Sequence, residues 1–359
     1  MNHADNANPR NLWGRCLLWT APVVLWLALT AGGAERTAAA PTPMPMATPA
    51  VLADVLRPQI YFNSIPRIHT TAHFQLVNAR DAEWSERMGD MLELLYDCFC
   101  RDMKELGFAV SEPADPLTWL CFDGEKAFVE YARTADSFNA GWLREYYSPR
   151  TNRVALIRPD AMTRTVGIEA GGEPVDILPI SHEATHQFSY STGLFRRGVM
   201  YPVWLTEGVA MSFETDSART LGLNKFNLPR MKQLVRVRRA GRMLPLGRFM
   251  IMTHFRPDEG HDLGDLYAQA DGFFRFMLMN HGDQLRAYVA RLGAMAPGRR
   301  SPEALEAEFA AAFGAAGPLE AEWNDYLDKV ERILAGGDEK SPATASGAIA
   351  GLVTPVVNR

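Results

Sequence analysis

The chain has 359 residues, with 37 Lys and Arg against 42 Asp and Glu, and therefore carries a net charge of −5 at neutral pH. Proteins that bind nucleic acid through its phosphates need a cationic surface, so this acidic balance argues against that class. Hydrophobic residues make up 47% of the chain and aromatic residues 10%. Such a composition builds one large core or two ordinary ones, and it excludes a chain that is disordered over most of its length.

Residues 1–34 are typical of a secretory signal peptide. Two arginines precede an uncharged run from Cys16 to Ala34 that is rich in Leu, Val and Trp, and this order marks an export signal. Thr, Pro and Gly dilute the run, so we expect cleavage near Ala31 or Ala34, with an uncleaved membrane anchor as the alternative. We therefore expect the mature protein in the periplasm or outside the cell, without a stable membrane span.

The rest of the chain divides by composition. Residues 35–66 are rich in Pro and Ala and show no helical or strand period, so they predict a flexible linker. Residues 67–215 are expected to form an N-terminal α/β subdomain, and residues 216–335 a C-terminal helical subdomain. The Gly- and Ser-containing stretch 336–359 predicts a disordered tail.

Strand patterns come early in the folded part and helical patterns late. The early elements are a strand at 73–77, an amphipathic helix with apolar residues from 88 to 106, a strand at 117–122, a helix at 125–133 and a hairpin of 142–147 with 153–157. The later helices are 180–191, 203–213, 266–279, 283–292, 303–313 and one with an apolar stripe over 323–334. This order predicts the α+β class.

Cys98, Cys100 and Cys121 remain after loss of the signal. Cys98 and Cys100 lie on a predicted helix, where residues two apart point about 200° from one another. The two alternatives are a disulfide between one of them and Cys121, or three unpaired thiols, and spacing alone leaves both open.

His182, Glu183 and His186 form the motif H-E-x-x-H inside a predicted helix. Residues four apart share a helix face, so both imidazoles can reach one tetrahedral ion. Glu183 lies about 100° further round, which suits it as the general base for a water that the ion activates. The alternative is a surface helix with two solvated histidines.

Glu207 lies in the next predicted helix, within the segment W-L-T-E-G-V-A (204–210). A catalytic zinc site needs a third protein ligand beside two histidines. Glu207 has no evident salt-bridge partner on its apolar helix, and a buried unpaired carboxylate is costly unless it meets a cation. We therefore expect it to complete a site for one zinc ion per chain.

The two motifs together resemble the gluzincin class of zinc metallopeptidases, and more narrowly the bacterial peptidase-MA-like domains, many of them of unknown function. The resemblance extends from about residue 73 to 334. It implies a zincin-like fold with a small mixed N-terminal sheet, an active-site helix and a C-terminal helical subdomain. It also implies three zinc ligands and a base, namely His182, His186 and Glu207, with Glu183.

A later Y-x-Q segment of those domains corresponds to Tyr267-Ala268-Gln269. Amide hydrolysis needs a donor that stabilises the oxyanion, and a tyrosine hydroxyl or a histidine near the cleft can serve. Tyr267 and His261 are the candidates. The alternatives are a packed core tyrosine and an ordinary loop histidine.

Related sequences tend to carry a small hydroxyl residue after the Gln, where this chain has Ala270 and then Asp271. Asp271 or Asp265 is a candidate for orienting a ligand imidazole by accepting its distal N–H. Glu214 shares a helix face with Glu207 and is a third candidate. Each is otherwise an exposed or capping carboxylate.

The resemblance places the strand Arg153–Ile157 at the edge of the sheet along the cleft, where it would pair with an extended substrate. The alternative is an edge strand without that use.

A basic run spans residues 230–248 of this acidic chain. It would favour anionic substrates or membrane headgroups, although such a run is more often a solvated helix face.

These observations predict an exported zinc-dependent metallohydrolase, with peptide or protein as its substrate. The alternative is a catalytically silent, zinc-stabilised module that binds peptide or cell-wall material and needs no oxyanion donor. A third possibility, two amphipathic helices without a metal, requires Glu207 to lie far from both histidines.

Overall fold

The computed structural model describes residues 61–62, 66–78, 82–158, 177–214, 222–223, 227–255 and 262–337. Its strands are β1 (Arg67–Thr70), β2 (Phe74–Asn78), β3 (Leu117–Phe122), β4 (Glu145–Ser148) and β5 (Arg153–Ile157). Its early helices are α3 (Ala82–Glu105), α4 (Glu125–Tyr131) and the π-helix η3 (Ala132–Asp136). The later ones are α5 (Ile177–Ser191), α6 (Val203–Ser212), α7 (Leu228–Arg239), α8 (Leu246–Phe249), α9 (Leu263–Asn280), α10 (Gly282–Ala294), α11 (Pro302–Phe313) and α12 (Ala316–Gly337). The small mixed sheet followed by helices confirms the α+β class.

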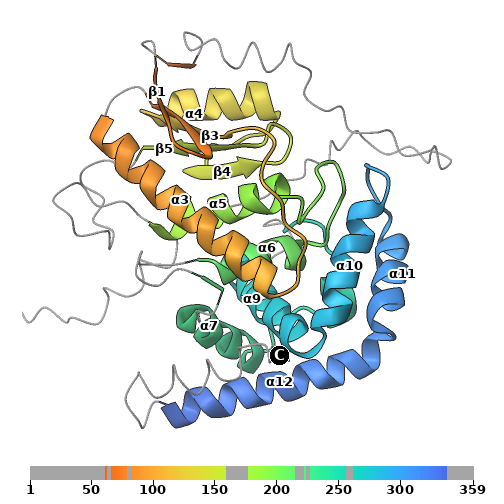
Figure 1. The fold of residues 1–359 in the computed structure, drawn as a ribbon. Helices are drawn as coiled ribbons and strands as arrows, with labels where there is room; N and C mark the ends of the chain where they lie inside the picture. The colour runs from red at the N-terminus through yellow and green to blue at the C-terminus, as the bar shows by residue number, and fades with distance from the viewer. Residues whose placement is uncertain are drawn as a thin grey trace, which may run out of the picture.

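The sheet has the strand order β1-β2-β3-β5-β4 (Figure 1). β2, β3 and β5 run parallel, while β1 and β4 pair antiparallel at the two edges. The expectation that Arg153–Ile157 forms the edge is therefore wrong. Its residues are nearly all buried, as is typical of an interior strand, and the hairpin places β4 outside it.

Side chains alternate between the two faces of the sheet, and both faces are buried. On β3, Trp119 and Cys121 point into the main core cluster, while Leu120 and Phe122 join a second cluster with Phe128 of α4. Figure 1 shows α4 on one side of the sheet and α3 and α5 on the other. Helices therefore cover the sheet from both sides, and α5 lies directly against it.

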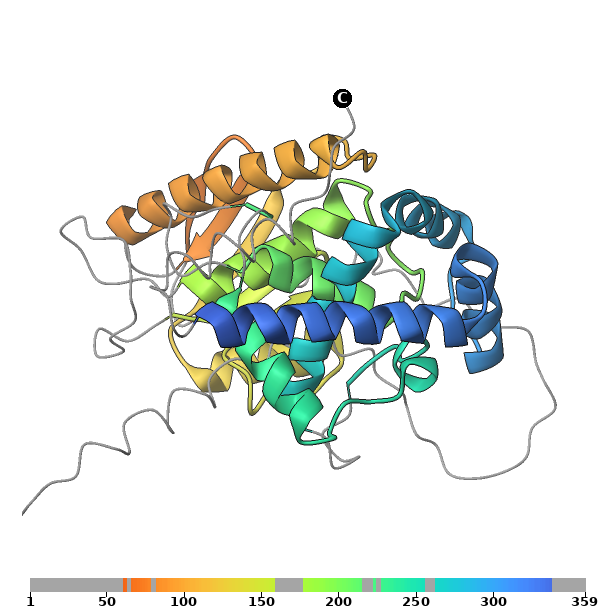
Figure 2. The same cartoon turned by 90° about the horizontal axis from the view of Figure 1, so that it is seen from below.

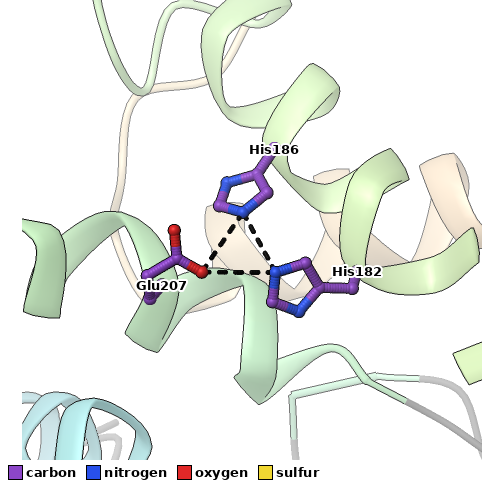
Figure 3. A group of neighbouring side chains, drawn as sticks. All are labelled: His182, His186 and Glu207. Carbon is purple, nitrogen blue, oxygen red and sulfur yellow. Dashed lines mark hydrogen bonds and ion pairs between the residues drawn. The ribbon is translucent and has the colours of Figure 1, made fainter. Parts of the chain in front are cut away.

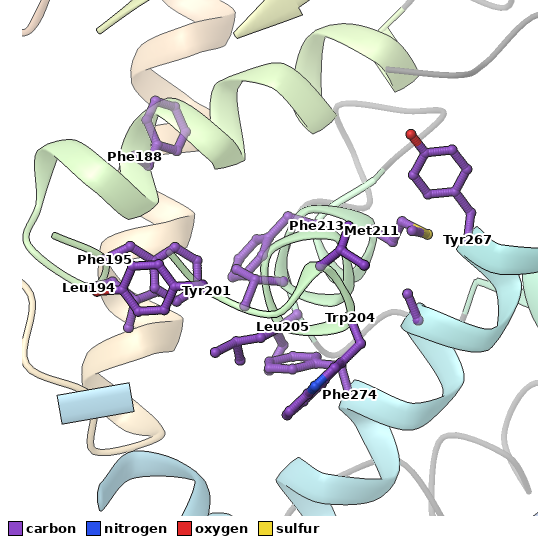
Figure 4. Close-up of a cluster of buried hydrophobic side chains, with 14 of the residues drawn as sticks. Phe188, Leu194, Phe195, Tyr201, Trp204, Leu205, Met211, Phe213, Tyr267 and Phe274 are labelled. Carbon is purple, nitrogen blue, oxygen red and sulfur yellow. The ribbon is translucent and has the colours of Figure 1, made fainter. Parts of the chain in front are cut away.

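Helix α6 lies at the centre of the helical part and is buried over its whole length. It packs closely on α9, because a Cβ added to Gly208 would lie 2.3 Å from Cβ of Phe274 and 2.9 Å from the carbonyl oxygen of Ala270. Figure 4 shows the surrounding apolar side chains, including Trp204 and Leu205 of the same helix. The segment that contains Glu207 is thus held on all sides.

The basic run forms α7 and the turn after it, and much of it is paired within the fold. Arg238 lies 2.7 Å from Asp328 and Arg239 2.5 Å from Glu331, both on α12, the long helix that crosses the molecule in Figure 2. Arg242 lies 2.8 Å from Asp265 on α9. These pairs attach α7 to its neighbours, which accounts for much of the run without an external anion.

The three described cysteines are free thiols, so a disulfide with Cys121 is excluded. Cys98 and Cys121 are buried and act as small apolar side chains. No helix among the described residues combines the length and apolarity needed to cross a bilayer. The signal peptide, most of the linker, most of the tail and His261 lie outside the described residues, and the division of the folded part at residue 215 stays a prediction.

Candidate metal centre

Helix α5 carries the H-E-x-x-H motif, and Gln187 fixes this helix to the sheet. The amide oxygen of Gln187 accepts a 2.8 Å hydrogen bond from the indole N–H of Trp119 on β3. Its amide nitrogen donates to the carbonyl oxygen of Asn152 at 3.0 Å, in the turn between β4 and β5. Each polar atom of this buried amide therefore has a partner. A shift of α5 along the sheet would break these hydrogen bonds, which fixes the position of the helix.

Three side-chain atoms converge between α5 and α6 (Figure 3). Nε2 of His182 lies 3.1 Å from Nε2 of His186, and Oε2 of Glu207 lies 3.3 Å and 3.5 Å from these two nitrogens. All three side chains are 1% exposed. The possibility of two helices without a metal site required a distant Glu207, so these distances remove its basis.

The three atoms fit a tetrahedral metal ion. Zinc bonds to N and O donors are about 2.0–2.1 Å long, which places two ligand atoms of a tetrahedron about 3.3–3.4 Å apart. Oε2 of Glu207 is buried and makes no hydrogen bond of good geometry with the described residues; a metal ion between it and the two neighbouring imidazole nitrogens would satisfy all three atoms. Two imidazoles and one carboxylate are also a common donor set for zinc. The buried group can therefore hold a metal ion.

Burial and neighbouring charges shift the pKa values within the cluster. Burial lowers the pKa of His182, but the carboxylates of Glu207 and Glu214 outweigh burial and raise it to about 10. Burial lowers the pKa of His186. For Glu207, the two imidazoles outweigh burial and lower the pKa of the carboxyl group. The imidazole of His182 and the carboxyl group of Glu207 thus each favour the charged form of the other.

Glu183 lies near enough to the cluster for the charges of His182 and Glu207 to act on its pKa, and only one of its two oxygens accepts a hydrogen bond from the described residues. Its Oε2 accepts a 2.6 Å hydrogen bond from the backbone N–H of Tyr147 on β4. Its Oε1 is buried without a hydrogen-bond partner among the residues that the structure describes. Burial is the main reason why the pKa of Glu183 rises to about 8. With this pKa the carboxyl group exchanges its proton in the neutral to weakly basic range, and it acts as a base in its ionised form.

Tyr267 on α9 lies beside the cluster. Its ring meets the imidazole of His182 edge-on, with 6.3 Å between centroids and an angle of 90°. Burial, followed by the charges of Glu207 and Glu183, raises the pKa of its hydroxyl, which stays protonated as a donor. Figure 4 shows this hydroxyl directed away from Trp204 and Phe274.

The carboxylate that orients a ligand imidazole is Glu214, just after α6. Its Oε1 lies 3.0 Å from Nδ1 of His182, which leaves Nε2 of that ring for the cluster. The two other candidates, Asp271 and Asp265, have different partners. Asp271 accepts a hydrogen bond from Arg275 one turn along α9, and Asp265 accepts from Arg242 near the surface.

Three residues of the site were missed by sequence reasoning. Tyr147 acts through its backbone N–H, so its side-chain type carries no signal. Arg230, which holds Glu214, looks like any other member of the basic run. Gln187 follows His186 directly, but polar residues are frequent on this helix, so its type gave no signal.

Residues 176–298, about a third of the chain, match a family described as "Protein of unknown function (DUF1570)". The matched stretch contains all the residues that make up the cluster, from α5 through α9. No curated protein matches the chain. The chain is thus similar, over its candidate metal centre, to a family whose function is not established.

Proposed function

We propose that this protein is an exported zinc-dependent hydrolase, and more narrowly a metallopeptidase. One observation carries the proposal: three buried donor atoms of His182, His186 and Glu207 converge within 3.5 Å, and Glu183 lies within electrostatic reach of His182 and Glu207. The resemblance of the two motifs to gluzincin peptidases supports the narrower reaction. Export rests on the N-terminal sequence alone.

The residues divide the work of hydrolysis. His182, His186 and Glu207 would hold a zinc ion, and the bound ion would supply the Lewis acidity that polarises a carbonyl and lowers the pKa of a water molecule. Glu183 takes the proton from the attacking water on its free Oε1, while the N–H of Tyr147 keeps the other oxygen in place. Tyr267 donates from its protonated hydroxyl to the developing oxyanion.

The peptide substrate rests on the motif resemblance, because the outer strand β4 offers little free edge. Its Tyr147 N–H already donates to Glu183, and Tyr146, Tyr147 and Ser148 are buried. Unstructured protein, whose amide bonds are accessible, is a suitable first substrate.

Metal analysis together with casein hydrolysis tests the proposal. We expect about one zinc ion per purified mature chain, loss of that zinc in His186→Ala and Glu207→Ala, and hydrolysis that a chelator stops and added zinc restores. A wild-type chain that binds no metal in excess zinc would overturn the proposal.

The deep burial of the cluster, with ligand side chains 1% exposed, favours a second candidate, a silent zinc-stabilised binding module. The same experiment separates the two. A module of this kind would bind zinc through the same ligands and gain thermal stability from it, but it would hydrolyse neither casein nor a panel of peptides.

A further inference from the structure

Glu214 is held by more than its contact with His182. Its carboxylate accepts four hydrogen bonds, two at each oxygen. Oε1 accepts from His182 at 3.0 Å and from Nη2 of Arg230 at 3.2 Å. Oε2 accepts from Nδ2 of Asn227 at 3.0 Å and from Nε of Arg230 at 3.3 Å. All the acceptor positions of an ionised carboxylate are therefore used.

The guanidinium of Arg230 grips the carboxylate with two parallel N–H groups, one on each oxygen. This fork fixes the plane of the carboxylate as well as its distance. The Glu214 side chain is 1% exposed and that of Arg230 is 11% exposed, so water is largely excluded from the pair. A lysine at this position would offer only a single ammonium group on a flexible side chain, and it would not fix the plane of the Glu214 carboxylate.

Arg230 also contacts Tyr267, the aromatic residue of α9 that lies beside His182. Its Cζ lies over the ring of Tyr267, 5.8 Å from the centroid, and that ring meets His182 edge-on. The start of α7 holds Arg230 in turn, because Oδ1 of Asn227 caps the helix by accepting from the backbone N–H of Arg230 at 3.2 Å.

We propose that Arg230 is a positioning residue of the metal centre, which sets the orientation of the His182 imidazole through Glu214. This inference rests on the metal site of the proposed function and extends it to α7. Arg230 touches neither the ion nor a substrate. By holding Glu214, it keeps the His182 imidazole in the orientation that metal binding requires, and this preorganisation raises the affinity for metal.

The test measures zinc affinity by competition with a chromophoric chelator, on the mature chain and on four variants. Glu214→Gln should weaken zinc binding roughly 10- to 100-fold, as loss of a partner to a ligand histidine does. Arg230→Met should weaken it roughly tenfold and Arg230→Lys less. The double variant should bind about as weakly as Glu214→Gln alone, since the arginine acts through that carboxylate.

Two further measurements separate positioning from general support of the fold. Arg238→Met removes an arginine of the same helix that pairs with α12, and it should leave zinc affinity within about twofold of the wild type. The visible absorption of bound Co²⁺ should change in the same direction in Arg230→Met and Glu214→Gln, and remain unchanged in Arg238→Met.

Wild-type zinc affinity in both Arg230 variants would overturn the inference. It would also be overturned if Arg230→Met weakened zinc binding by the same factor in the wild type and in Glu214→Gln. If Arg230→Met does not fold, Arg230→Lys decides by the same comparison. Failure of the proposed function would look different, because the wild type would then bind no zinc or would bind it independently of His186.

Discussion

The backbone N–H of Tyr147 and the carboxylate of Glu183 join the outer strand of the sheet to the helix of the candidate metal centre, over 2.6 Å. The bond occupies one oxygen of Glu183 and leaves Oε1 without a hydrogen-bond partner in the part of the chain that the structure describes. The helix and the strand thus fix the direction in which this carboxylate can accept a proton.

Glu183→Gln tests that role directly. The amide oxygen can still accept from Tyr147, so the fold and the three metal ligands should remain. Since an amide cannot take up the proton, we expect casein hydrolysis to fall by about 10²–10⁴ with zinc content unchanged. Hydrolysis at the wild-type rate in a zinc-loaded variant would contradict the role.

Tyr267→Phe removes one hydroxyl beside the cluster. If that hydroxyl stabilises the oxyanion, kcat should fall by about 10²–10³ while zinc affinity stays near the wild-type value. The control is Tyr288→Phe, whose buried hydroxyl has no hydrogen-bond partner among the described residues. The control should keep the wild-type kcat. Equal kcat values in the two variants would show that the Tyr267 hydroxyl has no part in catalysis and that its ring serves only in packing.

Gly208→Ala should disturb the contact between α6 and α9. The added methyl would meet Cβ of Phe274 at 2.3 Å and the Ala270 carbonyl oxygen at 2.9 Å, and backbone cannot yield cheaply. We expect a loss of about 1–3 kcal/mol in the free energy of unfolding, measured by urea denaturation. Gly317→Ala on α12 is the control, because nothing lies within 4 Å of its added Cβ. It should be neutral or stabilising by up to about 1 kcal/mol.

The ion pair of His73 with Glu93 should make stability depend on pH. Nδ1 of His73 lies 2.6 Å from Oε2 of Glu93. Burial lowers the pKa of His73, but Glu93 and Glu112 outweigh it and raise the pKa above its usual 6.5. Burial raises the pKa of Glu93, but hydrogen bonds from Thr71 and His73 lower it below its usual 4.5.

The raised pKa of His73 gives stability that is fully present below 6.5 and lost as pH rises through the folded value. The lowered pKa of Glu93 gives stability that is present above 4.5 and lost as pH falls through its folded value. The Tm difference between wild type and His73→Gln should therefore be largest between these two values. A difference that does not shrink toward pH 9 would refute the pairing.

Much of the fold followed from local pattern. The apolar period of α3 and the uninterrupted apolar strand β3 appear where the sequence predicted them, because period and length are properties of a short segment. The basic run suggested helix α7 only as a solvated helix face, and its four buried apolar residues were overlooked among the charged ones. Its start signals, Asn227 as N-cap and a proline in the first turn, were nonetheless present.

The sequence by itself determined that His182 and His186 share a helix face, because helical spacing is local, and it indicated Glu207 as a third donor, because a carboxylate on an apolar helix is costly to bury without a cation. Only the tertiary structure decided which carboxylate orients His182, which arginine holds that carboxylate, and which strand reaches Glu183. These contacts depend on how α7, α9 and β4 pack around α5. Contacts between segments far apart in the sequence produce no local pattern of residues from which they could be predicted.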